Sequence, residues 1–97
     1  MPPSKQPPPE PAQESPLVFP CDFEIKVFGK TEEDFPQHVA EIVRRYAPGL
    51  EPERIRVRPS REGRYISVVM TVNATSKEQL EAIYHDLQKD ARVLATL

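Results

Sequence analysis

The stretch that decides the fold is Arg54–Ala74, which reads RIRVRPSREGRYISVVMTVNA. In its first part, Ile55 and Val57 alternate with arginines, and in its second part apolar residues occupy every other position from Ile66 to Val72. A period of two is typical of β-strands that bury one face and expose the other. The link Ser60–Gly63 ends in a glycine, which adopts positive φ without steric cost. The stretch therefore predicts a β-hairpin.

Further periodic segments flank the hairpin. Residues 22–29 alternate in the same way and predict a first strand, and residues 91–97 suit a short last one. Apolar residues recur at helical spacing in residues 35–46 and again in residues 80–87. Pro36 fits the first turn of the first helix, and Thr75-x-x-Glu78 and Ser76-x-x-Gln79 are overlapping capping boxes for the second. The order β-α-β-β-α-β predicts an α+β ferredoxin-like sandwich, a four-stranded antiparallel sheet with two helices on one face.

The apolar faces of these segments predict a single core beneath the two helices. Each residue of that core lies on the apolar side of its own period and contributes roughly 1.5–3 kcal/mol on burial. The expected members are Ile25, Val27, Val39, Ile42, Val57, Ile66, Val68, Met70, Leu80, Ile83 and Leu87.

Composition separates the first 16 residues from the rest of the chain. Eight of the 12 prolines lie within residues 1–20, and residues 1–16 contain no aromatic side chain. Such a segment has little to bury. We therefore expect a disordered proline-rich tail over residues 1–16, followed by a single domain over residues 17–97.

The bulk properties narrow the cellular setting. Cys21 is the single cysteine, so no intramolecular disulfide can form and a reducing compartment is expected. No apolar run approaches the roughly 18 residues of a membrane span, and the N-terminus lacks the apolar core of a signal peptide. The net charge of −2 provides no general attraction to nucleic acid or anionic lipid. We expect a cytoplasmic protein without membrane contact.

Several motifs lie in one register through residues 17–97: Phe19-Pro20, Lys26-Val27-x-Gly29, Ala47-Pro48-Gly49, Pro59-Ser60, Gly63-x-Tyr65-x-Ser67-Val68 and Val72-Asn73-Ala74-Thr75. In these motifs the chain resembles the YbeD-like family of small bacterial proteins of unknown function. The resemblance implies a ferredoxin-like domain similar to ACT domains, which are amino-acid-sensing modules of metabolic enzymes. It implies no settled activity, and it does not extend to the proline-rich residues 1–16.

The residues do not indicate enzyme chemistry. The loop Gly29–Asp34 holds three carboxylates where an acylphosphatase of this fold needs an arginine, and it lacks the cysteine pair of heavy-metal-binding relatives. His38 and His85 fall on different helices with no Ser or Cys nucleophile near them in sequence, and solvated helix-face positions suit both. We therefore expect no catalytic residue, no metal and no cofactor.

A candidate contact surface lies on the sheet face that the helices leave open. The arginines of the first hairpin strand are expected there beside Tyr65, with Phe28 one strand further in. They could protect an edge strand, bind an anionic protein or ligand, or grip RNA while the aromatics stack bases. The signature of RNA-recognition motifs is absent, because Gly63–Val68 supplies one aromatic only. The candidate residues are Phe28, Arg54, Arg56, Arg58 and Tyr65.

The resemblance to ACT domains implies a small-ligand loop at Gly29, Lys30 and Thr31, next to the start of the first helix. Free N–H groups at a helix N-terminus can bind a carboxylate. The acidic run Glu32-Glu33-Asp34 opposes such a ligand and is better explained as charge that complements the helix dipole.

These observations favour a non-enzymatic, ACT-like regulatory or adaptor domain. Its expected partner is an unknown protein, with a small ligand as a second kind of partner and nucleic acid not favoured. RNA binding on the open sheet face is the alternative function, and an uncharacterised enzyme is the least favoured one.

Overall fold

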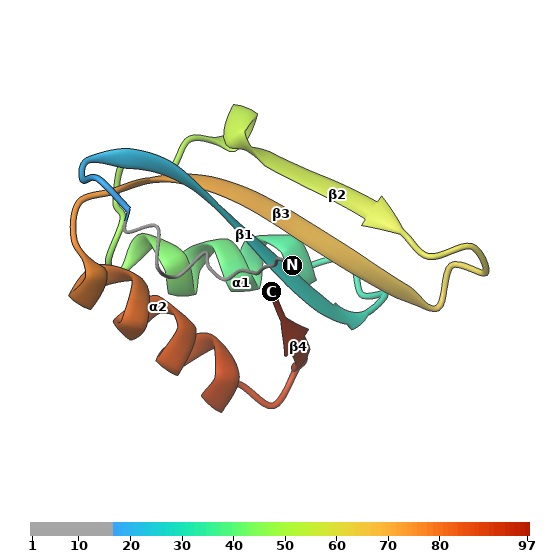
Figure 1. The fold of residues 1–97 in the computed structure, drawn as a ribbon. Coiled ribbons are helices and arrows are strands. Elements are labelled where there is room, and N and C mark those ends of the chain that lie inside the picture. Colours follow the sequence, from blue (N-terminus) through green and yellow to red (C-terminus); the bar gives the residue numbers. More distant parts are fainter. Residues whose placement is uncertain (1–16) are drawn as a thin grey trace, which may run out of the picture.

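The computed structural model describes residues 17–97 as two helices packed on one four-stranded sheet (Figure 1). The sheet order is β2-β3-β1-β4, and all neighbouring strands are antiparallel. Both helices lie on the same side of the sheet, which confirms the predicted ferredoxin-like sandwich. The elements are β1 (Cys21–Lys30), α1 (Phe35–Arg44), the 3-10 helix η3 (Pro52–Arg54), β2 (Ile55–Pro59), β3 (Tyr65–Ala74), α2 (Lys77–Lys89) and β4 (Val93–Thr96).

The predicted hairpin is formed by β2 and β3. Gly63 has a φ of 79°, and its N–H donates to the carbonyl of Ser60 at 3.0 Å. Ser60 N–H in turn donates to the carbonyl of Tyr65 at 2.7 Å and closes the turn. Glycine is thus required at position 63 for the conformation that the sequence predicted.

Each helix begins close to its predicted start. Pro36 occupies the first turn of α1, where its missing N–H costs least. The N-cap of α2 is Ser76, whose Oγ accepts a hydrogen bond from Gln79 N–H at 3.0 Å. Gln79 Oε1 accepts a hydrogen bond from Thr75 N–H at 2.7 Å. The cap of α2 therefore combines Thr75 of the first predicted capping box with Ser76 and Gln79 of the second.

The core fills the space between the helices and the sheet, and ten of its eleven predicted members are buried. Val57 was predicted wrongly, because its side chain is 45% exposed. It pairs with the fully buried Val68 and therefore faces the helix side of the sheet. Its strand β2 lies at the sheet edge, however, while α1 and α2 pack against β1, β3 and β4. The period identified the correct face, but no helix covers that face at the edge strand.

Within residues 17–97, no helix is long and apolar enough to cross a membrane. The tail predicted over residues 1–16 lies outside the described residues.

Candidate functional site

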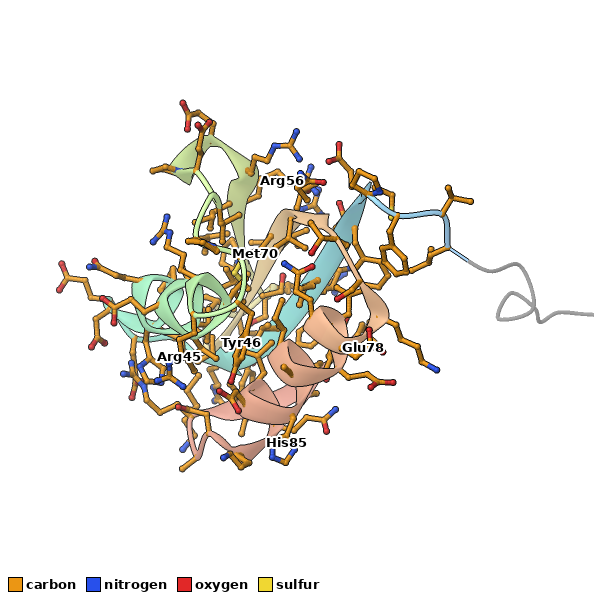
Figure 2. All side chains as sticks on the ribbon, turned by 90° about the vertical axis from the view of Figure 1, so that its left-hand side faces the viewer. Arg45, Tyr46, Arg56, Met70, Glu78 and His85 are labelled. Atoms are coloured by element: carbon orange, nitrogen blue, oxygen red, sulfur yellow. The ribbon has the colours of Figure 1, made fainter. Side chains whose placement is uncertain are left out.

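The open face of the sheet carries the outward side chains of the three strands that bear the candidate residues. Cross-strand pairing places Arg56, Val69 and Lys26 in one row and Arg58, Ser67 and Phe28 in the next. Figure 2 shows Arg56 on the sheet, away from Arg45, which directly follows α1, and from His85 on α2. The predicted neighbourhood of the hairpin arginines and Phe28 is therefore present.

Two of these arginines bind carboxylates of the same face. Arg54 Nη1 lies 3.1 Å from Asp22 Oδ1, and Arg56 Nη2 donates to Glu24 Oε2 at 2.9 Å. Both pairs reach from the β2 side across β3 to β1. The stem of Arg56 lies next to Val69, which is only 4% exposed although it faces away from the helices. These pairs shield the sheet surface and neutralise this end of it.

The other end of the open face keeps its cations unpaired. In the described part of the chain, no carboxylate forms an ion pair with Lys26, Lys30 or Arg58. Tyr65 pairs with Lys30 in the sheet and is 47% exposed. We call this surface the basic end: Lys26, Phe28, Lys30, Arg58 and Tyr65.

A shallow hollow of about 240 Å³ lies within the basic end. Phe28 and Tyr65 contribute aromatic walls, and Arg58 contributes a cation. The remaining lining residues are Pro59, Ser60, Ile66 and Ser67. The hollow therefore offers apolar contact beside positive charge.

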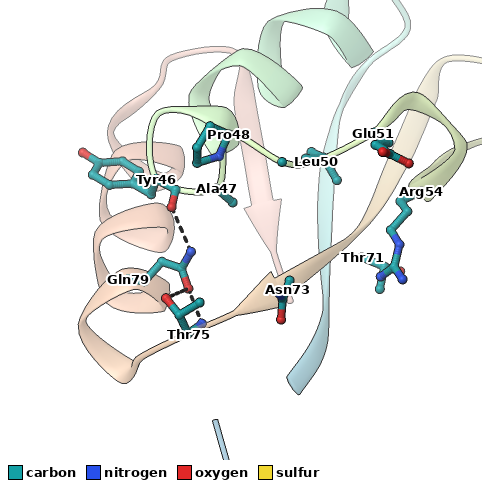
Figure 3. A pocket seen from close by; sticks show the side chains of 11 residues that line it. Tyr46, Ala47, Pro48, Leu50, Glu51, Arg54, Thr71, Asn73, Thr75 and Gln79 are labelled. Carbon is teal, nitrogen blue, oxygen red and sulfur yellow. Dashed lines mark hydrogen bonds between the residues drawn. The ribbon is translucent and has the colours of Figure 1, made fainter. Parts of the chain in front are cut away.

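A larger pocket of about 550 Å³ lies where α1 ends and α2 begins (Figure 3). The loop after α1 forms one wall with Pro48 and Leu50, and the end of β3 forms the other with Asn73. Gln79 joins the walls, since its Nε2 donates to the carbonyl of Tyr46 at 2.8 Å. The hydroxyl-bearing residues Thr71 and Thr75 line the pocket without a His beside them, and Thr75 Oγ1 donates to Gln79 Oε1 at 3.2 Å. The sequence analysis did not identify this pocket, because its walls come from three separate segments.

In the predicted small-ligand loop, side-chain packing and hydrogen bonds within the domain already fill the space and use the hydrogen-bond donors. The ring of Phe35 lies directly against Gly29, in the space that a Cβ would need. Thr31 N–H donates to the carbonyl of Arg64 at 2.9 Å, and its hydroxyl donates to the carbonyl of Gly63 at 2.6 Å. This loop is thereby fastened to the turn of the hairpin, and a small ligand there stays a prediction.

The acidic residues before α1 have a partner that the sequence did not suggest. Arg92 Nη2 lies 2.8 Å from Glu32 Oε1 and 2.7 Å from Asp34 Oδ1, and its guanidinium stacks on the Phe35 ring at 5.7 Å. The hydrogen bond from Arg92 holds the pKa of Asp34 below its ordinary value. These charges therefore fasten the start of β4 to the start of α1, besides complementing the helix dipole.

His38 differs from the expected solvated histidine. Its Nε2 lies 2.7 Å from Asp90 Oδ2, and both side chains are partly buried. Burial acts to raise the pKa of Asp90, but hydrogen bonds from the Arg92 backbone N–H and the His38 ring outweigh it and lower that pKa. The pair links α1 to the residue after α2 and has a structural explanation. Across residues 17–97, no group of three or more His, Cys, Asp or Glu side chains could hold a metal ion.

The structure divides the predicted contact surface in two. Phe28, Arg58 and Tyr65 come together around one hollow, whereas Arg54 and Arg56 are engaged with Asp22 and Glu24. The alternation of residues 22–28 already placed the two carboxylates on the open face. Their pairing with arginines depends on β1 lying beside β3, which period alone does not reveal.

Comparison with known proteins places the chain in a family. The family model described as "Protein of unknown function (DUF493)" matches residues 14–97. A UPF0250 protein of Nitrosomonas europaea is 41% identical over 85 residues, which cover 88% of this chain and 98% of that protein. A UPF0250 protein of Pseudomonas paraeruginosa is 45% identical over 78 residues, covering 79% of this chain and 84% of the relative.

A solved structure supports the same fold. The solution structure of protein HP0495 from H. pylori matches with a TM-score of 0.65 at 15% sequence identity, covering 92% of this chain and 93% of that one. At this identity the likeness concerns the fold alone. On the family match and the identity to its relatives, the chain belongs to the DUF493 family, whose relatives carry the name UPF0250, as the motif resemblance predicted.

Proposed function

We propose that this protein is a non-enzymatic adaptor domain that binds an acidic segment of a protein partner on the basic end of its open sheet face. The observation that carries the proposal is the hollow between Phe28 and Tyr65, which Arg58 lines. Lys26 and Lys30 flank Phe28 on the same face of β1, and none of these three cations forms an ion pair within residues 17–97. Aromatic and arginine side chains contribute most of the binding energy in many protein interfaces. Unpaired positive charge adds attraction to an acidic partner and speeds its association.

The charge pattern of the face favours a protein over RNA. A single-stranded nucleic acid follows a continuous positive groove over several nucleotides. Here Asp22 and Glu24 continue the line of β1 directly beyond Lys26, and their ion pairs with Arg54 and Arg56 leave that end without excess positive charge to hold a phosphate chain. The cationic surface is therefore long enough for a short peptide segment and is then interrupted.

The likeness to ACT domains implies a regulatory role. The proposal keeps that role but does not require a small ligand. A domain of this size can regulate a partner by occupying one of its segments, without a small ligand. The contacts that fill the space around Gly29 and engage both donors of Thr31 favour this reading over ligand sensing in that loop.

The test compares partner binding by wild-type protein and by Tyr65→Ser and Arg58→Glu variants. Proteins captured from bacterial lysate are identified, purified and titrated against each variant by calorimetry. Both side chains are exposed, so the melting temperature should stay close to wild type. Affinity for a true partner should fall about tenfold or more with either change.

Lys77→Glu is the matched control, because it makes a similar charge reversal on α2, on the far side of the sheet. It should leave partner affinity unchanged. A purified partner that binds Tyr65→Ser, Arg58→Glu and wild-type protein equally well would refute the proposed surface. Capture of RNA instead of protein, lost with the same variants, would establish the nucleic-acid alternative.

A further inference from the structure

The outward residues of β1 at the basic end follow a regular order. Lys26, Phe28 and Lys30 occupy alternate positions of one strand and share the open face. In a strand of about 3.4 Å per residue, successive outward residues stand about 7 Å apart, so the two lysines are about 14 Å apart. The surface thus presents cation, aromatic and cation in a line.

No acidic side chain among residues 17–97 forms an ion pair with the two lysines of this line. The next outward residues of β1, Glu24 and Asp22, bind Arg56 and Arg54, whereas the two lysines are left without a carboxylate among residues 17–97. Arg58 adds a third cation that has no ion pair among residues 17–97, and it lies across β3 on the far wall of the hollow beside Phe28. The complementary surface must therefore bring negative charge on both sides of an apolar group.

From this arrangement we infer that the partner segment is extended and carries an acidic, an apolar and an acidic residue at positions i, i+2 and i+4. The inference rests on the proposed function and specifies its partner. The two acidic residues meet Lys26 and Lys30, and the apolar residue enters the hollow between Phe28 and Tyr65. Arg58 lies beside that apolar residue and strengthens the attraction to both carboxylates.

An extended segment fits the line better than a helix does. Its side chains on one face repeat at about 7 Å, which is the spacing of the outward residues of β1. A helix keeps residues i, i+4 and i+7 on one face but at only about 6 and 10.5 Å along its axis, which is short of the roughly 14 Å between the two lysines. One helix face therefore cannot meet all three residues of the line equally.

A second copy of the chain does not supply this segment through its own strands. The residues of β2, β3 and β4 include no Asp or Glu. In β1 the two acidic residues Asp22 and Glu24 are followed at the same spacing by Lys26, which breaks the pattern. The described strands therefore do not supply the segment. Elsewhere in the sequence, the same order at the same spacing occurs at Glu10, Ala12 and Glu14. Equal probe affinity of the wild-type protein and a Glu10→Gln/Glu14→Gln variant assigns the surface to a segment of another protein, whereas tighter probe binding by the variant assigns it to the chain's own segment and overturns the inference.

The test uses fluorescent seven-residue peptides and the whole protein. The probe carries Glu at its second and sixth positions, Phe at its fourth and Thr elsewhere. One comparison peptide has Lys in place of both Glu residues, and another has the same composition with the two Glu residues adjacent. Fluorescence anisotropy should show the probe binding about tenfold or more tightly than either comparison peptide, with affinity falling as salt rises.

The protein variant is Lys26→Gln with Lys30→Gln, which removes both charges and keeps long polar side chains. This variant should bind the probe about tenfold more weakly, whereas Lys77→Gln with Lys89→Gln on α2 should leave the affinity for the probe unchanged. Equal affinity of all three peptides, or full affinity in the Lys26→Gln/Lys30→Gln variant, would overturn the inference. So would displacement of the probe by an oligouridylate that binds more tightly than the peptide.

The outcomes separate this inference from the proposed function. A purified partner that depends on Tyr65 but not on Lys26 and Lys30 would support the proposed function and overturn the acidic pattern. A probe that binds as expected, with no protein partner depending on Tyr65, would uphold the pattern and reject the adaptor role.

Discussion

Gly29 is constrained by a contact with a side chain that follows it by six residues. Its φ lies outside the left-handed region, yet a Cβ there would meet three atoms of the Phe35 ring, two of them at 2.7 and 2.8 Å. Phe35 is itself fully buried and is the largest of the completely buried side chains. Glycine at position 29 thus allows the start of α1 to pack closely against β1.

The first prediction concerns this contact. Gly29→Ala should lower the free energy of unfolding by about 1–3 kcal/mol, because the buried ring has to move. Gly49→Ala is the control, since nothing lies within 4 Å of a Cβ at that position. Denaturant titration of both variants measures the difference. Equal stability of Gly29→Ala and wild type would show that Phe35 adjusts freely.

A second prediction at the residue scale uses two valines that pair across the sheet. Val68→Ala should cost about 1–3 kcal/mol, because Val68 is fully buried and a cavity remains. Val57→Ala should change stability by about 0.5 kcal/mol or less, because its side chain is already half exposed at the edge. Urea unfolding of both variants tests the assignment, and equal losses would contradict it.

At the scale of the elements, Gln79 connects the start of α2 to two other segments. It accepts from Thr75, donates to the carbonyl of Tyr46 beyond the end of α1, and its N–H is capped by Ser76. The larger pocket lies beside this connection. One side chain therefore sets the spacing between the two helices at this end of the molecule.

The third prediction is that Gln79→Ala costs about 1–3 kcal/mol, because a partly buried carbonyl loses its donor together with the back-bond to Thr75. Gln88→Ala, on the exposed side of the same helix, should cost far less. Amide hydrogen exchange should show faster opening of residues 46–50 in Gln79→Ala. Unchanged exchange there would mean that the loop is held by its other contacts.

At the scale of the whole molecule, carboxylates fasten the helix layer together. Asp34 binds Arg92, Asp86 accepts from the Tyr46 hydroxyl at 2.7 Å, and Asp90 lies against His38. Each of these contacts joins α1, or the residues next to it, to α2 or to the start of β4. The hydrogen bond from Tyr46 holds the pKa of Asp86 below its ordinary value, as the contacts already described do for Asp34 and Asp90.

The fourth prediction concerns pH. Because these pKa values are lowered in the folded state, the unfolded chain takes up protons first as pH falls. The stabilisation is fully present above the ordinary value of 3.8 and is lost as pH drops through the lower folded values. Thermal melts between about pH 6 and pH 2 should therefore show a declining melting temperature mainly below about pH 4.

An Arg92→Gln variant tests how much one of these contacts contributes to the pH dependence of stability. The variant removes the principal cause of the lowered pKa of Asp34, so its stability should fall less steeply in acid than that of wild type. Arg61→Gln, in the exposed hairpin turn, is the control and should keep the wild-type slope. An identical acid slope in Arg92→Gln and wild type would show that the Arg92 contact has no influence on acid stability.

The sequence by itself determined the element order, the hairpin with its glycine, the capped start of α2 and the face of each strand. These features depend on neighbours within a few residues, through side-chain period, turn conformation and local hydrogen bonds. The same local logic identified Phe28, Arg58 and Tyr65 as residues of one face.

The tertiary structure alone decided which residues of a face are covered and which charges are paired. Val57 has the pattern of a core residue and is exposed, because the helices do not extend over the edge strand. Arg54 and Arg58 look equivalent in sequence, yet Arg54 meets Asp22 while Arg58 meets no carboxylate within residues 17–97. Burial and charge pairing depend on strand order and on segments distant in the chain, and local period carries no information about either.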